Sequence, residues 1–313
     1  MQNRRLGNTD LYLSEVGFGC ASIWGKTFFE EEKSIELFLK AYELGINFFD
    51  TGSSYGDAEI RLGKCITKLG KTQRSKLIIA TKCGTRRNSE GKAYHDWNLD
   101  WLKKSVMYSL KHLQTDYIDM LHLHGPGITD LTDEVVKTLQ DMKAKGIIRA
   151  IGVNSFDTEV LEYIYKTQCF DFVMLDYNIM RQDREDLIER LYTAGIGVIA
   201  GAALAQSLYS NRIYRIKTKN DIWYLLRALK NFRGHMIYGQ KFRFINKHPL
   251  YTGNQIALRY VLNNSYITSA VFGTANVEHM VENCKAVNID LDQETLDRIR
   301  LQYRNSRKSK LDR

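Results

Sequence analysis

Eight short apolar runs alternate with segments of helical periodicity between residues 16 and 271 of the chain. The intervening segments carry apolar residues three and four positions apart, as one-sided helices require. A regular alternation of eight strands with helices over about 250 residues predicts an α/β fold of the closed (β/α)8 TIM-barrel type. The apolar runs are residues 16–18, 46–49, 77–80, 118–123, 150–153, 172–175, 197–200 and 269–272, and the helical segments are residues 31–44, 58–69, 99–113, 131–145, 159–166, 184–194 and 254–262.

Glycines mark the ends of these helical segments. Gly45, Gly70, Gly146 and Gly195 stand where the helices should stop, because glycine takes the left-handed capping conformation without steric cost. An open doubly wound sheet is the alternative fold, and it would need a glycine-rich phosphate loop after its first strand. Residues 17–22 read Gly-Phe-Gly-Cys-Ala-Ser and lack the third glycine of such a loop, so the sequence favours the barrel.

Two additional elements flank the predicted barrel. Residues 4–6 and 11–13 flank the sequence Gly-Asn-Thr-Asp at 7–10, which predicts an N-terminal β-hairpin able to plug the N-terminal end of the barrel. Residues 292–304 have the pattern of an extra C-terminal helix. No linker rich in proline, glycine or serine interrupts the chain, so we expect residues 1–313 to form a single domain.

The composition is that of an ordinary folded protein. Hydrophobic residues make up 44% and charged residues 26%, which argues against a disordered chain. No apolar run approaches the roughly 20 residues of a membrane helix, and the polar N-terminus lacks the core of a signal peptide. The five cysteines are odd in number and never spaced as CxxC, which suits reduced thiols and gives no zinc signature. We therefore expect a cytoplasmic protein with no membrane partner.

The net charge of +9 is concentrated in two segments. Residues 206–250 hold ten Lys or Arg and one acid, residues 298–313 hold seven and one, and the rest of the chain therefore sums to −6. Such a local charge is weak evidence for nucleic-acid binding, and no nucleic-acid-binding motif accompanies it. We expect no nucleic-acid partner, and we interpret residues 305–313 as a solvated basic tail.

Four polar residues follow or end three neighbouring strands of the predicted barrel. Asp50 ends the second strand, Lys82 the third and His124 the fourth, and Tyr55 lies on the loop after Asp50. In a TIM barrel the chemistry takes place at the C-terminal ends of the strands, so these side chains should meet at one mouth.

This set of side chains has a coherent chemical use. A buried lysine beside a tyrosine lowers the pKa of the phenol, and a carboxylate keeps that lysine charged and fixed. A tyrosine tuned in this way can give and take a proton near neutrality, while a histidine can donate a hydrogen bond to a carbonyl oxygen as negative charge develops there. The combination suits carbonyl–alcohol interconversion, provided that an organic cofactor supplies the hydride.

The same residues fall within three segments that resemble the aldo-keto reductase family. Residues 47–56 read Asn-Phe-Phe-Asp-Thr-Gly-Ser-Ser-Tyr-Gly, residues 80–82 read Ala-Thr-Lys, and residues 116–124 read Asp-Tyr-Ile-Asp-Met-Leu-His-Leu-His. The resemblance extends from the N-terminal hairpin to about residue 283. It implies that Asp50, Tyr55, Lys82 and His124 form a catalytic tetrad, with Tyr55 as the general acid/base, and that NADPH or NADH binds across the barrel mouth.

Two histidines on the fourth strand compete for the catalytic position. His122 and His124 lie two residues apart and therefore face the same way. The family pattern selects His124, and His122 is expected one layer deeper as a packed core residue. A His-x-His pair also suggests a metal, but other strand ends offer no further ligand besides Asp50, and Lys82 would repel a cation. We therefore expect no metal.

The resemblance also implies a set of cofactor contacts, and the sequence departs from the family at some of them. Met174 stands where a glutamine usually contacts the nicotinamide amide, and Gly201 stands where a tyrosine often stacks on the ring. NADP-preferring relatives usually place Arg or Lys near Ala275 and His279. We expect NADPH as the cofactor, with NADH as the alternative. The implied contacts are Gly19, Cys20, Asn154, Ser155, Met174, Gly201, Gly273, Thr274, Asn276, His279, Glu282 and Asn283.

In this family the segment after the seventh strand, here residues 206–250, covers the cofactor and shapes the substrate pocket. Its ten basic residues would attract an anionic substrate such as a phosphorylated or nucleotide-linked sugar, and Trp24 and Trp223 are expected to line the pocket. The prediction is an NAD(P)-dependent oxidoreductase that interconverts a carbonyl and an alcohol on a sugar-like small molecule. Two alternatives stay open: an NAD-linked sugar dehydrogenase working in the oxidative direction, and a catalytically silent nucleotide-binding regulatory subunit.

Overall fold

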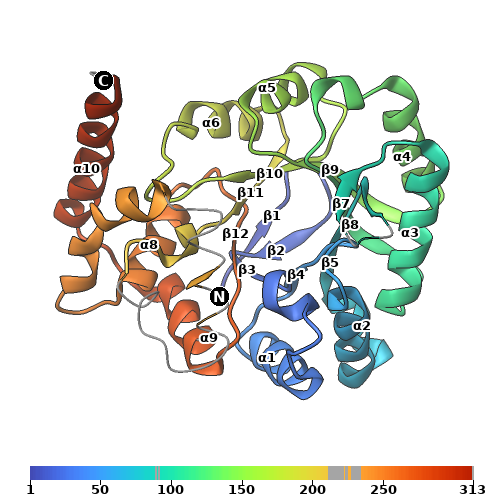
Figure 1. Cartoon of the computed structure of the whole chain (residues 1–313), viewed down its shortest axis with the longest axis horizontal. Helices are drawn as coiled ribbons and strands as arrows, with labels where there is room; N and C mark the ends of the chain where they lie inside the picture. Colours follow the sequence, from blue (N-terminus) through green and yellow to red (C-terminus); the bar gives the residue numbers. More distant parts are fainter. Residues whose placement is uncertain (89, 91, 211–221, 223–224, 227–233, 312–313) are drawn as a thin grey trace.

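Eight parallel strands close into a barrel at the centre of the molecule (Figure 1). The computed structural model describes residues 1–88, 90, 92–210, 222, 225–226 and 234–311. The strands pair in the order β10-β11-β12-β3-β4-β5-β8-β9, and the predicted (β/α)8 barrel is confirmed. The strands are β3 (Val16–Gly19), β4 (Phe48–Asp50), β5 (Ile78–Cys83), β8 (Ile118–His124), β9 (Ile148–Asn154), β10 (Phe172–Asp176), β11 (Gly197–Gly201) and β12 (Ser269–Phe272).

Helices surround the barrel, and each helical segment predicted from periodicity is present with ends shifted by no more than two residues. Their buried faces carry the apolar residues that the pattern predicted, such as Leu37 and Phe38 in α1. The α-helices are α1 (Glu31–Glu43), α2 (Ala58–Leu69), α3 (Leu99–Leu113), α4 (Asp133–Ala144), α5 (Thr158–Thr167), α6 (Glu185–Thr193), α8 (Gly253–Leu262), α9 (Val277–Cys284) and α10 (Gln293–Leu311), and the short 3₁₀ helices are η1 (Ser22–Gly25), η2 (Lys71–Lys76), η3 (Ile128–Asp130), η4 (Ala205–Ser207), η6 (Arg243–Lys247) and η7 (Lys285–Asn288).

The N-terminal hairpin closes one end of the barrel, as predicted. Strands β1 (Asn3–Arg5) and β2 (Tyr12–Ser14) pair antiparallel, and Leu6, Leu11 and Leu13 pack into one cluster with residues of the barrel interior. The turn between the strands is tied to the barrel by the backbone N–H of Asn8, which donates to the carbonyl of Gly195 at 2.9 Å. The leucines therefore fill the N-terminal end of the barrel, opposite the C-terminal ends of its strands.

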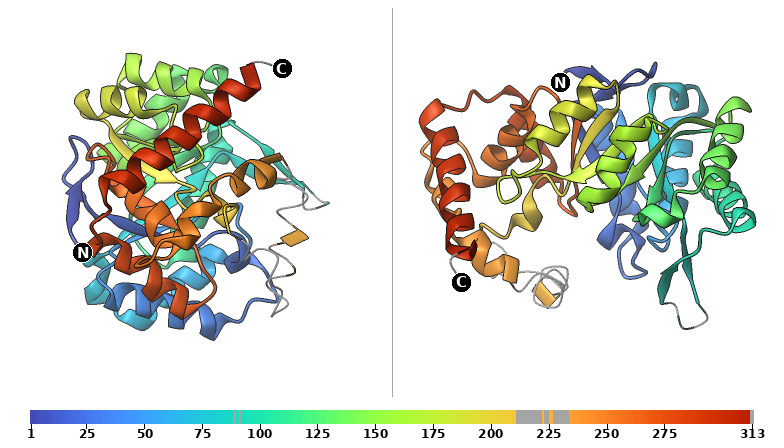
Figure 2. Two further views of the ribbon diagram at one scale, coloured as in Figure 1. Left: turned by 90° about the vertical axis from the view of Figure 1, so that its left-hand side faces the viewer. Right: turned by 90° about the horizontal axis from the view of Figure 1, so that it is seen from above.

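A second hairpin was not predicted. Strands β6 (Thr85–Arg87) and β7 (Ala93–His95) pair antiparallel directly after β5 and project from the barrel (Figure 2). Both strands are three residues long and largely exposed, so they lack the apolar alternation by which strands are detected. The chain leaves β5 through Gly84, whose positive φ of +88° suits a sharp turn.

The C-terminal helix is longer than the sequence indicated. Helix α10 runs along the outside of the barrel to Leu311, so the expected tail at 305–313 is helical over most of its length (Figure 2). No glycine or proline interrupts residues 305–311, and basic residues are favourable in the last turns of a helix because of its dipole. The residues that we expected as a basic tail therefore continue the helix as far as Leu311.

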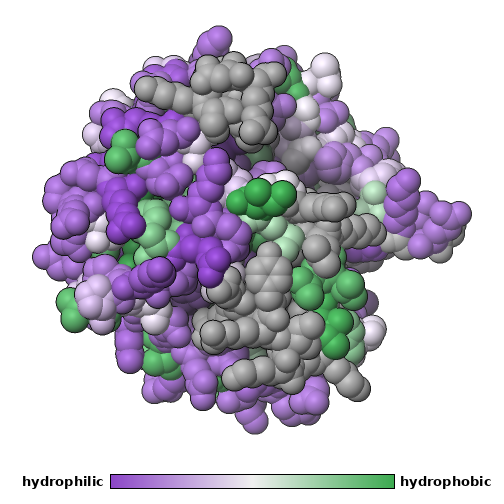
Figure 3. Space-filling view, turned by 60° about the vertical axis from the view of Figure 1, so that its left-hand side comes forward, coloured by the Kyte–Doolittle hydropathy of each residue, from purple (hydrophilic) through white to green (hydrophobic). Residues whose placement is uncertain are grey.

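The surface in Figure 3 is mostly hydrophilic, with hydrophobic side chains in small separate groups. Within the described part of the chain, no helix combines the length and the apolar character that a membrane span requires.

Candidate active site

Three neighbouring strands bring Asp50, Lys82 and His124 to the C-terminal mouth of the barrel. Asp50 pairs in register with Ala80, and Lys82 pairs with His122 on the next strand. Because side chains on one strand alternate between its two faces, Asp50 shares the inward face with Phe48, and Lys82 shares it with Ala80. The strand ends predicted from the sequence therefore meet at one site.

Lys82 and Asp50 form a buried ion pair at the centre of this site. The Lys82 ammonium lies 2.7 Å from both carboxylate oxygens of Asp50 and 2.7 Å from the carbonyl oxygen of Thr51. The two side chains are only 2% and 7% exposed. Burial by itself would lower the pKa of Lys82, but the charge of Asp50 and the neighbouring Tyr55 outweigh it, so that the pKa of the lysine is raised. The lysine is therefore a fixed positive charge.

Tyr55 lies against this lysine and against His124. The Lys82 ammonium is 5.1 Å from the centroid of the tyrosine ring, and Tyr55 contributes to raising the pKa of the lysine. The Tyr55 and His124 rings meet edge to face with centroids 5.7 Å apart. Gly25 of η1 packs so tightly on the Tyr55 backbone that a Cβ there would lie 1.4 Å from the carbonyl oxygen. The position of the tyrosine is thus set by backbone packing.

His124 is held by a hydroxyl group. Its Nδ1 lies 3.1 Å from Oγ1 of Thr85, the first residue of β6. Burial, together with the positive charge of Lys82 and the nearby His95, lowers the pKa of His124 to about 3. The imidazole is therefore neutral at the pH values where an enzyme normally works.

His122 lies one layer deeper, and its predicted place in the core is confirmed. Its side chain is fully buried and packs edge to face on Phe172 with ring centroids 4.8 Å apart. Its Nε2 is 3.6 Å from Asp50 Oδ1, too far for a hydrogen bond, and neither ring nitrogen has a hydrogen-bond partner among the described residues. Burial and the charge of Lys82 hold the pKa of His122 well below its ordinary value.

Several of the residues expected to contact a cofactor surround the same mouth. Gly19, Asn154 and Gly201 are the last residues of their strands, and Met174 lies two residues before the end of β10. The amide of Asn154 donates to the carbonyl of Met174 at 3.4 Å. A Cβ on Gly201 would approach the Met174 side chain to 3.2 Å, so these two departures from the family pattern are direct neighbours.

Two expected cofactor contacts, Cys20 and Ser155, and one expected substrate-pocket residue, Trp24, have side chains engaged away from the mouth. The side chain of Cys20 is buried in the cluster between strands and helices, so only its backbone can face the mouth. The hydroxyl of Ser155 accepts the backbone N–H of Asp157 at 3.1 Å, which engages it in the turn before α5. Trp24 is 1% exposed and packs on Phe18, so its indole is a core group, and Trp223 lies outside the described residues.

The segment from β12 into α9 offers groups suited to a phosphate and an amide. Gly273 and Thr274 follow β12, and the side chain of Asn276 caps α9 by accepting the backbone N–H of His279 at 3.0 Å. A helix N-terminus of this kind favours anions. Farther along α9, Glu282 accepts a hydrogen bond from Thr252. Asn283 is 2% exposed, and its Oδ1 lacks a partner in the described part of the chain. Of this segment, the N-terminal end of α9 is therefore the part suited to a phosphate group.

The sequence did not reveal that the β6–β7 hairpin contributes residues beside the candidate active site. Arg87 donates to the backbone carbonyl of Ser54 at 2.7 Å, next to Tyr55, and the His95 ring lies 3.4 Å from where a Cβ on Gly125 would be. The available signal was the Asn-Ser-Glu-Gly turn sequence at 88–91 between two short segments, which is typical of a hairpin.

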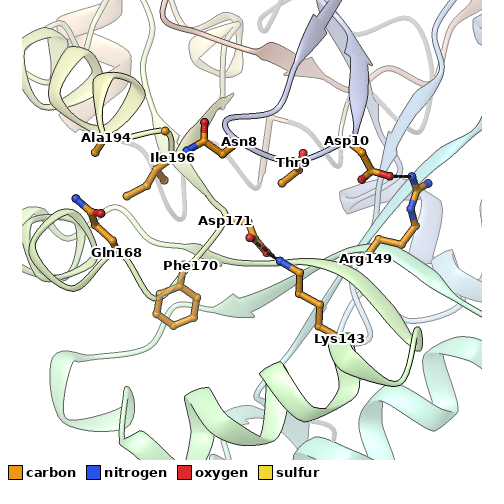
Figure 4. Close-up of a pocket in the computed structure, with 11 residues that line it drawn as sticks. Asn8, Thr9, Asp10, Lys143, Arg149, Gln168, Phe170, Asp171, Ala194 and Ile196 are labelled. Atoms are coloured by element: carbon orange, nitrogen blue, oxygen red, sulfur yellow. Dashed lines mark hydrogen bonds and ion pairs between the residues drawn. The ribbon is translucent and has the colours of Figure 1, made fainter.

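A cavity of about 310 Å³ lies at the other end of the barrel, between the N-terminal hairpin and the segments that precede β10 and β11 (Figure 4). The lysine and arginine side chains that line this cavity form ion pairs, since Lys143 lies 2.6 Å from Asp171 and Arg149 lies 3.0 Å from Asp10. It contains none of the residues of the mouth. Among the described residues, no group of three or more His, Cys, Asp or Glu could hold a metal ion.

A closed (β/α)8 barrel with Asp, Tyr, Lys and His side chains at its C-terminal mouth defines a nicotinamide-dependent oxidoreductase. The sequence model of the Aldo/keto reductase family matches residues 15–303. The chain belongs to this family.

Its similarity to individual members extends over nearly the full length of both chains. The chain is 32% identical over 318 residues to L-galactose dehydrogenase of Arabidopsis thaliana, which covers 95% of this chain and 92% of the relative. It is 26% identical over 316 residues to the NADH-specific methylglyoxal reductase of Escherichia coli, covering 93% and 95%. The holo form of aldo-keto reductase AKR11C1 from Bacillus halodurans superimposes with a TM-score of 0.79 at 27% identity, covering 96% of each chain.

Proposed function

We propose that this protein interconverts a carbonyl and an alcohol on a small sugar-like molecule, with Tyr55 as the group that transfers the proton. The observation that carries the proposal is the position of the Lys82 ammonium, which contacts Asp50 and Tyr55 at once beside His124. A bound nicotinamide cofactor would supply the hydride.

Each residue has a separate part in the proton transfer. The Tyr55 hydroxyl gives a proton to the carbonyl oxygen during reduction and takes it back during oxidation. The charge of Lys82 stabilises the phenolate that remains, and Asp50 keeps that charge in place. His124, being neutral, donates a hydrogen bond to the same oxygen while negative charge develops on it.

For the cofactor we propose NADPH, held by Asn154 near the nicotinamide and by the N-terminal end of α9 near the phosphates. His279, bonded through its backbone to the cap residue Asn276, is our candidate for a contact with the 2′-phosphate. The competing cofactor is NADH, because one relative is described as NADH-specific. Separate titrations with NADPH and NADH, followed by tryptophan fluorescence, test this. Tighter NADPH binding that is lost in His279→Ala is the expected result, and equal binding of both would contradict it.

The proposed substrate is a sugar or sugar-like compound with a negative charge. The sugar part is supported by the relative described as L-galactose dehydrogenase. The negative charge is supported by Arg87, which lies at Ser54 beside the candidate acid/base. The basic residues of 206–250 on which the sequence argument rested, such as Arg212 and Arg215, lie outside the described residues.

The decisive experiment is a turnover assay in both directions. Sugar aldehydes with NADPH, sugars with NAD⁺, and the phosphorylated form of each sugar should be compared for the protein and for Arg87→Met. We expect turnover, and we expect Arg87→Met to raise KM for phosphorylated substrates more than for neutral ones. Activity confined to oxidation with NAD⁺ would favour the dehydrogenase alternative. Cofactor binding without turnover of any substrate would refute the proposed function and favour the regulatory subunit.

We also propose a cytoplasmic location. All five cysteines are free thiols, and four of them are buried, which suits a reducing compartment. Fractionation of the source cells with an antibody to the protein tests this location.

A further inference from the structure

The contact between Thr85 and His124 joins two separate elements at the mouth of the barrel. Thr85 begins the β6–β7 hairpin and is 7% exposed, and its Oγ1 lies 3.1 Å from Nδ1 of His124 at the end of β8. Gly84, packed under Trp97, turns the chain so that Thr85 faces the histidine. The hairpin therefore has a direct connection to the candidate active site.

The position of one proton on His124 decides what the ring can do. A neutral imidazole carries a single N–H, so that one nitrogen donates and the other accepts. His124 is neutral because burial and the charge of Lys82 disfavour its protonated form. It can donate to a substrate oxygen through Nε2 only if the proton is on Nε2 and not on Nδ1.

The Thr85 hydroxyl selects between these two forms. Nδ1 of His124 is the partner that the structure gives for this buried hydroxyl among the described residues. If the hydroxyl donates to Nδ1, its hydrogen is satisfied and the histidine proton must be on Nε2. If Nδ1 carried the proton, the hydroxyl hydrogen would be buried without an acceptor in the described part of the site, at a cost of about 1–3 kcal/mol. That difference corresponds to a preference of roughly 5- to 150-fold for the Nε2–H form.

We propose that Thr85 is a positioning residue that holds His124 as the Nε2–H tautomer, and so keeps a hydrogen-bond donor ready for the substrate oxygen. Its effect on catalysis rests on the proposed function, whereas the tautomer itself can be measured in the resting protein. The first residue of the β6–β7 hairpin then sets the proton position inside the site.

The experiment compares Thr85→Val, which keeps the shape and removes the hydroxyl, with Thr85→Ser, which keeps the hydroxyl. Proteins labelled with ¹⁵N-histidine report the tautomer by NMR, and a His124→Gln sample assigns the signal. Thr81→Val is the matched control, because Thr81 is also a buried threonine of this segment but bonds to Glu59 at 2.6 Å, away from the site.

We expect the Nε2–H form in the unchanged protein, in Thr85→Ser and in Thr81→Val, and a mixed or Nδ1–H signal in Thr85→Val. In turnover, Thr85→Val should lose kcat by about 10- to 100-fold, as when the hydrogen-bond partner of a metal-bound histidine is removed, with little change in KM. Thr85→Ser should restore most of it. If Thr85→Val is too unstable to purify, Thr85→Ala serves for the same comparison.

An unchanged Nε2–H signal in the variants that lack the hydroxyl would overturn the proposal. A changed signal with unchanged kcat would also overturn it, because the tautomer would then not matter to the reaction. A changed signal in a protein that turns over none of the tested substrates would support the role of Thr85 and refute the proposed function instead.

Discussion

Removal of the Lys82 ammonium should destabilise the protein strongly, and by an amount that depends on pH. In Lys82→Met the carboxylate of Asp50 would remain buried without its cation, and leaving one partner of a buried pair in this way costs about 3–5 kcal/mol. The carboxylate can escape this cost by taking up a proton. At pH 7, about 3 units above the ordinary pKa of an aspartate, that protonation costs about 4 kcal/mol, and this cost is the upper limit of the destabilisation by Lys82→Met.

The direction of the pH dependence follows from the same reasoning. Burial already raises the pKa of Asp50 against the opposing charge of Lys82, and in the variant that pKa would lie further above its unfolded value, so the folded protein would hold a proton that the unfolded chain releases. Stability is then lost as the pH rises from about 4 toward the folded-state pKa, at about 1.4 kcal/mol per pH unit. The destabilisation relative to the unchanged protein should therefore shrink from about 4 kcal/mol at pH 7 to about 1.5 kcal/mol at pH 5.

Urea unfolding followed by circular dichroism at pH 5, 6 and 7 measures these differences. The double variant Asp50→Leu/Lys82→Met removes both charges and should be more stable at pH 7 than Lys82→Met alone. Lys137→Met, which removes an exposed lysine paired with Asp141, is the control and should change little. A loss below about 1 kcal/mol at pH 7, or the same loss at pH 5 and pH 7, would refute the assignment of a buried charged pair.

Three further predictions follow from the site. Tyr55→Phe should reduce kcat by about 10²- to 10⁴-fold with an unchanged thermal unfolding curve, and near-normal turnover would exclude its role as acid/base. His122 and His124 have lowered pKa values in the folded protein, so each should lower the free energy of unfolding by about 2 kcal/mol as the pH falls from 6.5 to 5. Urea unfolding of His122→Leu should show a loss of stability over this pH range that is smaller by one histidine's share, and an unaltered pH dependence would contradict this. Gly25→Ala should displace the Tyr55 backbone and lower kcat by about 100-fold, and a variant with the kcat of the unchanged protein would exclude the packing argument.

The barrel could be predicted from the sequence because the patterns that indicate its strands and helices lie within short continuous segments. Each strand is a short apolar run, each helix carries its own periodicity, and several helices are followed by a glycine, such as Gly45 and Gly195 with φ of +90° and +81°. The candidate tetrad could be predicted for the same reason: a strand-end residue such as Lys82 or His124 is brought to the mouth by the fold, whatever its neighbours are.

Side-chain direction was harder to predict, because it depends on which face of a strand each residue occupies. Gly19 and Cys20 are adjacent in sequence, yet only Gly19 has the inward register, while Cys20 packs under the helices. Trp24 follows β3 closely enough to reach the mouth, but its ring is enclosed by Phe18 and Phe29. Such differences arise from packing between distant segments, which no single run of residues encodes.

One positive charge organises the electrostatics of the whole site. The Lys82 ammonium is held by Asp50, and its field contributes to keeping both His122 and His124 neutral and favours the phenolate of Tyr55. In the proposed mechanism, neutral histidines do not compete with Tyr55 as proton donors, so the tyrosine transfers the proton and His124 donates a hydrogen bond. The donor nitrogen of His124 would then be set by a neutral group outside the tetrad, the buried hydroxyl of Thr85, which lies 3.1 Å from Nδ1.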